Sequence, residues 1–230
     1  PGVLTLGTVN SQANTFTGGV VVAAGILSFP GEGNSAGAGT SNPLGIHPAT
    51  FQASQIIISN NATLRSTKAG AGSSFVFTNR GITLGTGGGV LEATASATTD
   101  YLIDGAKSTG PGSLTKAGAG TIYLQSAAND YAGDTTNKAG YLGIGANYPW
   151  SKGKLILAGG GITAFATSAV ITNNVTMTGS ATFRATTITS GTRALIFSNL
   201  WSTTSGTLTI RNLGTAGSIF SPRFFVGGWT

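Results

Sequence analysis

Two pairs of aspartates have the residue type and the spacing that carboxylate chemistry needs. Asp100 with Asp104, and Asp130 with Asp134, have even spacing, so an extended strand would place each pair on one face. Glycoside hydrolysis uses two carboxylates about 5–10 Å apart, and calcium sites use several carboxylates. Each pair also lies near glycine or asparagine, where aspartate commonly shapes a turn. Turn chemistry is the favoured interpretation, and a catalytic or ligand role stays open.

Two short motifs match known nucleophile patterns. Gly33-Asn-Ser35-Ala-Gly37 fits G-x-S-x-G, which needs a strand before the serine and a helix after it, together with a histidine and an acid. The following residues cannot start a convincing helix, and His47, the only histidine, precedes a proline. Ser113-Leu-Thr-Lys116 fits S-x-x-K, but odd spacing on a strand places the two side chains on opposite faces. We therefore expect no catalytic residues and no enzymatic activity.

Cofactor and metal sites find equally little support. The chain has no cysteine, which excludes disulfides and thiolate metal sites. Its glycine-rich runs lack G-x-G-x-x-G and the P-loop lysine. We expect no cofactor and no bound metal.

The formal net charge of +6 arises because acids are scarce, with 6 Asp and Glu against 12 Lys and Arg. No basic cluster resembles a nucleic-acid-binding stripe, so nucleic acid is not an expected partner. Lys152 and Lys154 form the densest basic pair. They are consistent with a solvated face, and attraction to an anionic surface polysaccharide is the alternative.

A long internal repeat organises the chain. Asn14-Thr-Phe-Thr-Gly18, followed by Ala24-Gly-Ile-Leu27, reappears as Asn129-Asp-Tyr-Ala-Gly133 and Ala139-Gly-Tyr-Leu142, at an offset of 115 residues. Upstream, Val3-Leu-Thr-Leu6 corresponds to Thr121-Ile-Tyr-Leu124, with a difference of three residues that falls in a turn. A repeat of this kind predicts stacked units that bury their apolar faces against one another.

The second copy also carries a family resemblance. Gly112-Ser-Leu-Thr-Lys-Ala-Gly-Ala-Gly-Thr-Ile-Tyr-Leu124, with Asn129-Asp-Tyr-Ala-Gly133 and Lys138-Ala-Gly-Tyr-Leu142, resembles the autotransporter-associated β-strand repeat of bacterial surface proteins. The resemblance covers most of the chain up to about Ala185 and weakens beyond it. It implies a right-handed parallel β-helix at the bacterial cell surface, and it implies no shared catalytic residues.

Composition independently predicts an all-β chain. Charged residues make up only 8%, there are 37 glycines, and no window shows sustained helical periodicity. Short apolar runs bounded by Gly, Asn or Ser predict strands; they are Val20–Val22, Ile56–Ile58, Phe75–Phe77, Leu155–Leu157 and Ala169–Ile171. Coils of roughly 20–25 residues would give a β-solenoid of about ten rungs. We expect one domain, 1–230, built from two imperfect repeats, 1–111 and 112–230.

Both ends of the predicted solenoid look adhesive. The N-terminal end opens directly into a strand-like segment, and the C-terminal end is aromatic rather than charged. The aromatic residues either plug the last rung or engage another subunit. The predicted self-assembly residues are Val3, Leu4, Leu6, Phe220, Phe224, Phe225 and Trp229.

These observations favour a structural or adhesive extracellular protein, either a rigid stalk or a subunit of a head-to-tail filament. A carbohydrate-binding or carbohydrate-cleaving β-helix is the alternative. No apolar run approaches the roughly 20 residues that span a membrane. The start at Pro1 rather than Met predicts a chain processed from a longer precursor, located outside the cell or on its surface.

Overall fold

The computed structural model consists of strands, turns and loops. It describes the following residues: 2–7, 13–31, 41–67, 79–94, 101–104, 107–124, 126–144, 150–164, 168–185, 192–211 and 219–224. Within these ranges there is no helix. The described part of the chain accordingly contains no apolar helix of membrane-spanning length.

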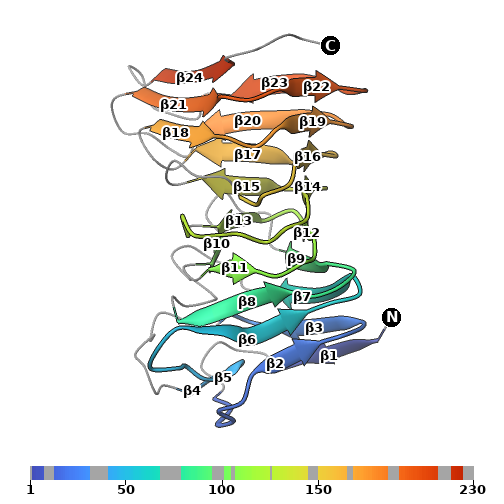
Figure 1. The fold of residues 1–230 in the computed structure, drawn as a ribbon, viewed down its shortest axis with the longest axis vertical. Helices are drawn as coiled ribbons and strands as arrows, with labels where there is room; N and C mark the ends of the chain where they lie inside the picture. The colour runs from blue at the N-terminus through green and yellow to red at the C-terminus, as the bar shows by residue number, and fades with distance from the viewer. Residues whose placement is uncertain are drawn as a thin grey trace.

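Most strands belong to four parallel sheets, and within each sheet the strands stack along one axis (Figure 1). Sheet 1 contains, in spatial order, β1 (Val3–Thr5), β3 (Ile26–Phe29), β7 (Ala62–Ser66), β9 (Gly89–Ala93), β12 (Leu114–Ala117), β14 (Thr135–Asn137), β16 (Leu155–Leu157), β19 (Val175–Met177) and β22 (Trp201–Thr203). Sheet 2 contains β10 (Tyr101–Asp104), β13 (Thr121–Leu124), β15 (Tyr141–Ile144), β17 (Gly161–Ala164), β20 (Ala181–Ala185) and β23 (Leu208–Arg211).

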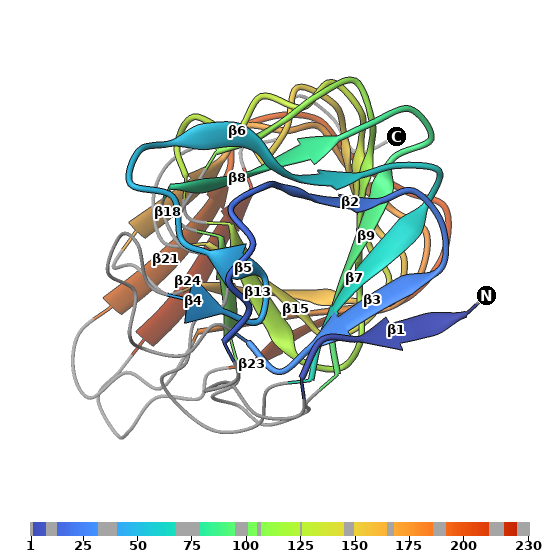
Figure 2. The same ribbon diagram turned by 90° about the horizontal axis from the view of Figure 1, so that it is seen from below.

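The remaining strands form the third side. Sheet 3 contains β11 (Ser108–Thr109), β8 (Arg80–Leu84), β6 (Gln52–Ile58) and β2 (Val20–Val22). Sheet 4 contains β18 (Ser168–Ile171), β21 (Thr192–Phe197) and β24 (Ile219–Phe224). The antiparallel pair β4 (Ser41–Asn42) and β5 (Gly45–Ile46) is a small hairpin beside the first rungs (Figure 2).

In one turn of the coil the chain passes from β8 in sheet 3 to β9 in sheet 1, β10 in sheet 2 and β11 in sheet 3, whereas the described strands from β12 to β17 alternate between sheets 1 and 2. In sheet 1, Leu114 pairs with Thr135, Thr135 with Leu155, and Leu155 with Val175, so these rungs are 21, 20 and 20 residues apart. This arrangement confirms the predicted all-β class with long parallel sheets and is compatible with a β-solenoid.

Alternation along each strand produces the core. In β16 and β19 the first and last residues are buried and the middle residue is half-buried. In-register inward positions therefore form columns through the interior, of which one runs through Leu27, Leu64 and Leu91. These columns bury apolar side chains in successive rungs, as the repeat predicts.

The rung corners use the expected residues. Asn60 and Asn61 have φ of 53° and 58°, and Gly118 and Gly140 have φ of 75° and 63°. This left-handed backbone favours glycine and asparagine. Hydroxyl groups also join neighbouring rungs, since Ser202 Oγ donates to Thr176 Oγ1 at 3.2 Å.

The structure corrects one prediction about a single strand, and another falls on residues that the structure does not describe. The alternation of threonine with apolar residues in Thr207–Ile210 predicts that Leu208 and Ile210 both point inward, but only Leu208 packs against the core. Ile210 is 51% exposed because β23 is the last strand of sheet 2. The predicted strand Phe75–Phe77 falls outside the described residues.

Candidate self-assembly surfaces

The N-terminal end of sheet 1 is an open strand edge. Among the described residues β1 pairs only with β3, through bonds that include Leu6 N–H to Ser28 O at 2.8 Å. Alternate residues of a parallel strand bond to the same neighbour, so the backbone groups of Val3 and Thr5 face away from β3. Val3 is 54% exposed and Leu4 63% exposed, whereas Leu6 packs against the core. The predicted N-terminal residues thus combine an unpaired edge with exposed apolar side chains.

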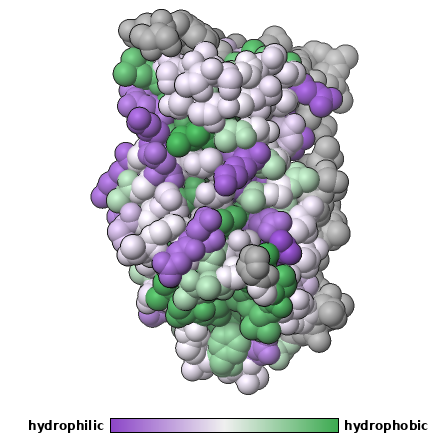
Figure 3. All heavy atoms as spheres, turned by 90° about the vertical axis from the view of Figure 1, so that its right-hand side faces the viewer, coloured by the Kyte–Doolittle hydropathy of each residue, from purple (hydrophilic) through white to green (hydrophobic). Residues whose placement is uncertain are grey.

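Sheet 3 adds a second open edge at the same end. β2 is its last strand, and Val21 is 65% exposed. A hollow of about 130 Å³ lies between the two edges, and Leu4, Val21, Ala24 and Ile26 are among the residues that line it. Figure 3 shows apolar residues gathered towards this end of the molecule, with hydrophilic residues over the middle.

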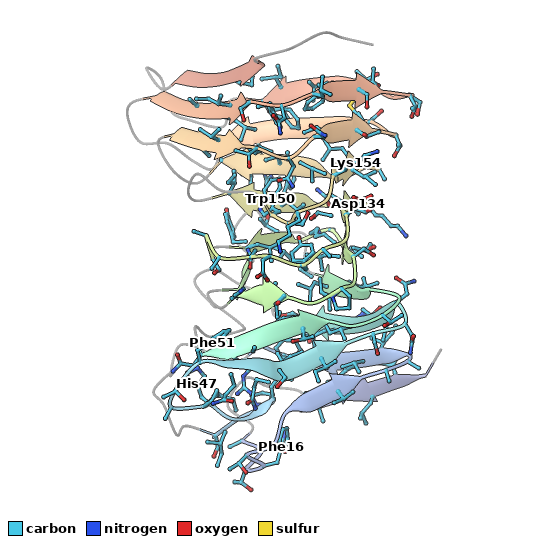
Figure 4. The ribbon with its side chains drawn as sticks, in the orientation of Figure 1. Phe16, His47, Phe51, Asp134, Trp150 and Lys154 are labelled. Carbon is cyan, nitrogen blue, oxygen red and sulfur yellow. The ribbon has the colours of Figure 1, made fainter. Side chains whose placement is uncertain are left out.

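The other exposed large apolar side chains of the described residues also lie near the ends. Phe16 and Phe51 belong to the first rungs (Figure 4), and Leu200 and Ile210 lie beside or within the last strands of sheets 1 and 2. The rungs between them bury their large apolar residues.

At the C-terminal end, β24 pairs with β21 and has no further strand neighbour among the described residues. Phe220 pairs with Arg193 and Phe224 with Phe197 in this register, so both predicted aromatics lie in the last strand of sheet 4. Phe225 and Trp229 lie outside the described residues. The assembly role predicted for these residues stays a prediction.

An aromatic cluster does fill the last rungs, but it uses other residues. Phe183 stacks on Phe197 at 5.1 Å between ring centroids, and Trp201 packs edge-on against Phe197 at 4.9 Å. All three are buried. Sequence reasoning missed this cluster because its members come from sheets 2, 4 and 1; the available signal was the alternation of apolar residues in Thr192–Phe197.

The candidate catalytic acids have structural contacts. Asp130 forms an ion pair with Lys107 at 2.7 Å, and the hydrogen bond from Lys107 holds the pKa of Asp130 below its usual range. Asp134 Oδ1 accepts the backbone N–H of Lys154 at 2.7 Å. Asp100 and the side chain of Asp104 lie outside the description. In the described ranges no three His, Asp or Glu residues group as metal ligands.

The two nucleophile motifs remain without a described catalytic setting. Ser35 lies outside the described residues. His47 is buried, and burial together with the nearby Arg80 lowers its pKa. Ser113 is exposed whereas Lys116 is buried, which confirms that the S-x-x-K pair points to opposite faces.

Lys116 is the unexpected residue of the interior. It pairs in register with Leu91, so it occupies a place in the leucine column. Its Nζ donates to the carbonyl oxygens of Ala117, Gly118 and Ala139 at 2.9, 2.5 and 2.7 Å. Burial lowers the pKa of Lys116 to about 7, against the opposing influence of Glu92. The side chain joins the corners of two rungs.

The two sequence copies have one local structure on different faces. In the first copy Val3 pairs in parallel with Ile26 in sheet 1, and in the second Thr121 pairs in parallel with Tyr141 in sheet 2. The middle strand shifts in the same direction, from sheet 3 for β2 to sheet 1 for β14. The repeat therefore specifies one turn of the coil, independently of the face on which that turn begins.

Comparison with known proteins agrees with this structural repeat. The family model described as passenger-associated-transport-repeat matches residues 1–29 and 114–144. No curated protein and no solved structure matches the chain. The matched segments contain β1 to β3 and β12 to β15, the strands that form the two equivalent turns. The repeat family implies a secreted or cell-surface protein, and this chain carries two copies of the autotransporter passenger repeat.

Proposed function

We propose that the chain is a structural, adhesive component of the bacterial cell surface, a rigid β-solenoid that forms a stalk or stacks head to tail into an extracellular filament. The observation that carries the proposal is the distribution of exposed apolar residues. Val3, Leu4 and Val21 lie on the open strands of one end, while Leu200 and Ile210 lie at the other. The two ends differ, so a contact between them is heterologous and extends into a filament unless it closes.

The proposal includes a right-handed coil of about ten rungs. The nine strands of sheet 1 support a rung number near this value. Connections between parallel strands of one sheet are right-handed in about 98% of known cases, which favours that hand. Each added rung extends the sheets by about 4.8 Å, so the body grows in length while its cross-section stays constant.

Stacking of two ends would pair open backbone groups and bury exposed apolar side chains. The backbone groups of Val3 and Thr5 would gain partners from an edge strand of the next subunit. The exposed side chains of Leu4 and Val21 would leave water, and burial of such a side chain contributes about 1.5–3 kcal/mol. The low charge of the chain, 8% of its residues, offers little repulsion against this contact.

The same proposal assigns the chain no catalysis and no cofactor. Asp130 and Asp134 support it, since each has a contact with a neighbouring rung, Asp130 with Lys107 and Asp134 with the backbone N–H of Lys154. Lys107 and Asp130 also bind each other in an ion pair, so neither stands ready as a separate acid or base.

Sedimentation velocity tests the stacking contact directly. A lysine at an edge strand blocks edge-to-edge pairing, so Leu4→Lys, alone or together with Val21→Lys, should convert concentration-dependent assemblies into single subunits. Deletion of 224–230 should do the same from the other end. The matched control is Thr136→Lys, at a half-buried outward position of β14 in the middle of sheet 1, which should leave assembly unchanged. Equal behaviour of the edge and control variants would refute end-to-end stacking.

A further inference from the structure

A column of three polar residues and one leucine follows the corner where the chain enters sheet 1. Asp134, Lys154, Asn174 and Leu200 occupy equivalent places in successive rungs, since the residue after each of the first three donates its N–H to the next member of the column. These bonds are Thr135 to Lys154 O at 2.8 Å, Leu155 to Asn174 O at 2.8 Å and Val175 to Leu200 O at 2.9 Å. Figure 4 shows Asp134 and Lys154 on this side of the coil.

A groove runs beside this column. A hollow of about 580 Å³ is lined by Asp134, Lys152, Lys154, Thr172, Asn174 and Asn199, among others. A second hollow, of about 290 Å³, shares Lys154 and Asn174 with it and continues to Leu200 and Ser202. The volumes fall in the range of small-molecule sites, about 300–1,000 Å³. Three rung intervals at ~4.8 Å give the groove a length of about 14 Å along the axis.

Side-chain bonds fix the floor of the groove. Asn173 is buried, accepts the Trp150 N–H at 3.1 Å, and donates to the carbonyls of Ser151 and Gly153 at 3.1 and 2.8 Å. Asp134 holds the N–H of Lys154 at 2.7 Å. These contacts order the backbone before a ligand arrives, so binding would not have to order it.

The walls carry positive charge and hydrogen-bonding groups. Lys152, Lys154 and Asn174 are exposed, whereas Asp134 is half-buried and has one oxygen on a backbone N–H. Lys152 and Lys154 supply two positive charges against the single carboxylate of Asp134. The amides of Asn174 and Asn199 and the hydroxyl of Thr172 offer both donors and acceptors. Leu200, 56% exposed, adds apolar surface at the far end.

We propose that this groove binds an acidic oligosaccharide that lies along the coil axis. The ammonium groups of Lys152 and Lys154 pair with carboxylate or sulfate groups of the sugar chain, and the asparagine amides bond to its hydroxyls. The inference does not depend on filament formation, since every residue of the groove comes from one chain.

A nucleic acid fits this groove less well. Binding of single strands relies on aromatic side chains that stack on the bases, and the one aromatic residue lining the groove, Trp201, is only 2% exposed. Two lysines beside a carboxylate also provide a weak phosphate track. Sugars need polar side chains and a small apolar contact instead, which this groove has.

Calorimetric titration tests the assignment with the Leu4→Lys chain, which removes assembly from the measurement. The probes are an oligogalacturonate, a heparin-derived oligosaccharide, the neutral maltohexaose and single-stranded DNA. An acidic sugar should bind, and maltohexaose and DNA should bind at least tenfold more weakly. Binding of the oligogalacturonate would show that carboxylates suffice, and binding of the heparin-derived oligosaccharide alone would show that sulfate groups are needed.

Variants then locate the site. Lys154→Gln should weaken binding of the acidic sugar about tenfold, the loss expected of one charge-assisted hydrogen bond. Asn174→Ala should weaken it by a smaller factor. Lys138→Gln is the matched control, because Lys138 is an exposed lysine outside the groove lining, and it should leave affinity unchanged. The inference is overturned by equal losses in Lys154→Gln and Lys138→Gln, by tighter binding of DNA, or by no binding of either acidic sugar.

Discussion

The ammonium group of Lys116 occupies space that a side chain on Gly140 would need. A Cβ at position 140 would lie 2.6 Å from Lys116 Nζ and 2.6 Å from Gly118 O, and would press still closer on Gly120 O. Gly140 also has a φ of 63°. A buried lysine and a glycine one rung further on are therefore a matched pair, which explains why the Lys-Ala-Gly corner of the second repeat needs glycine in last place.

Gly140→Ala should destabilise the chain by about 1–3 kcal/mol, because the new methyl group meets backbone and Nζ atoms while φ stays positive. Gly18→Ala is the control, since a Cβ there has nothing within 4 Å. Urea unfolding followed by circular dichroism measures both. A Gly140→Ala chain as stable as Gly18→Ala would show that the corner can rearrange freely.

The stability of the chain should rise with pH above neutrality. The pKa of Lys116 is about 7 in the folded chain, against the ordinary lysine value of 10.5. Between these values the unfolded chain binds the extra proton, so stability increases with pH across this window and is lowest, for this group, below pH 7. One proton contributes at most about 1.4 kcal/mol per pH unit. The nearby carboxylate of Glu92 opposes the lowering of this pKa.

Lys116→Leu isolates this effect, because Leu91 already occupies the equivalent place in the preceding rung. Urea unfolding at pH 7, 8 and 9 should show a steeper rise for the original chain than for the variant. Parallel curves would mean that Lys116 stays charged throughout.

Asn173 and Asn174 should differ sharply although they are neighbours. Asn173→Ala leaves the Trp150 N–H and the carbonyls of Ser151 and Gly153 without their amide partner in a buried site, and should cost about 2–4 kcal/mol. Asn174 is exposed, and Asn174→Ala should change stability by less than about 0.5 kcal/mol. Thermal unfolding measures the melting temperatures of the two variants. Similar melting temperatures would show that the buried Asn173 amide does not stabilise this corner.

The aspartates should not support hydrolysis. Since Asp130 pairs with Lys107 and Asp134 holds a backbone N–H, we expect no release of reducing sugar from polygalacturonate. Asp130→Asn and Asp134→Asn chains should behave like the original. Turnover in the original chain that one substitution abolishes, with circular dichroism unchanged, would reverse this interpretation.

The sequence predicted the strands better than their positions around the coil. Val20–Val22, Ile56–Ile58 and Leu155–Leu157 all lie in strands, because short apolar runs between turn residues have few other structures to adopt. An offset of 115 residues, however, does not tell on which face a repeat begins. The shift of the second copy to another pair of sheets depends on the residues in each intervening turn, which vary from rung to rung.

The interior polar residues and the groove were harder still to predict from the sequence. Lys116 is a charged residue in a core column, and only the carbonyls of Ala117, Gly118 and Ala139 make that place tolerable. The groove joins residues some 20 positions apart that register alone brings together. Of its lining, the sequence singled out Lys152 and Lys154 for their charge and Asp134 for its spacing from Asp130.

Cryo-electron microscopy of the concentrated, purified chain tests end-to-end stacking most directly. The account predicts rods several subunits long, in which the strand spacing of about 4.8 Å continues across each subunit boundary, and it predicts single short rods for Leu4→Lys. Particles that remain one subunit long at every concentration, or rods joined side by side with their ends free, would contradict it.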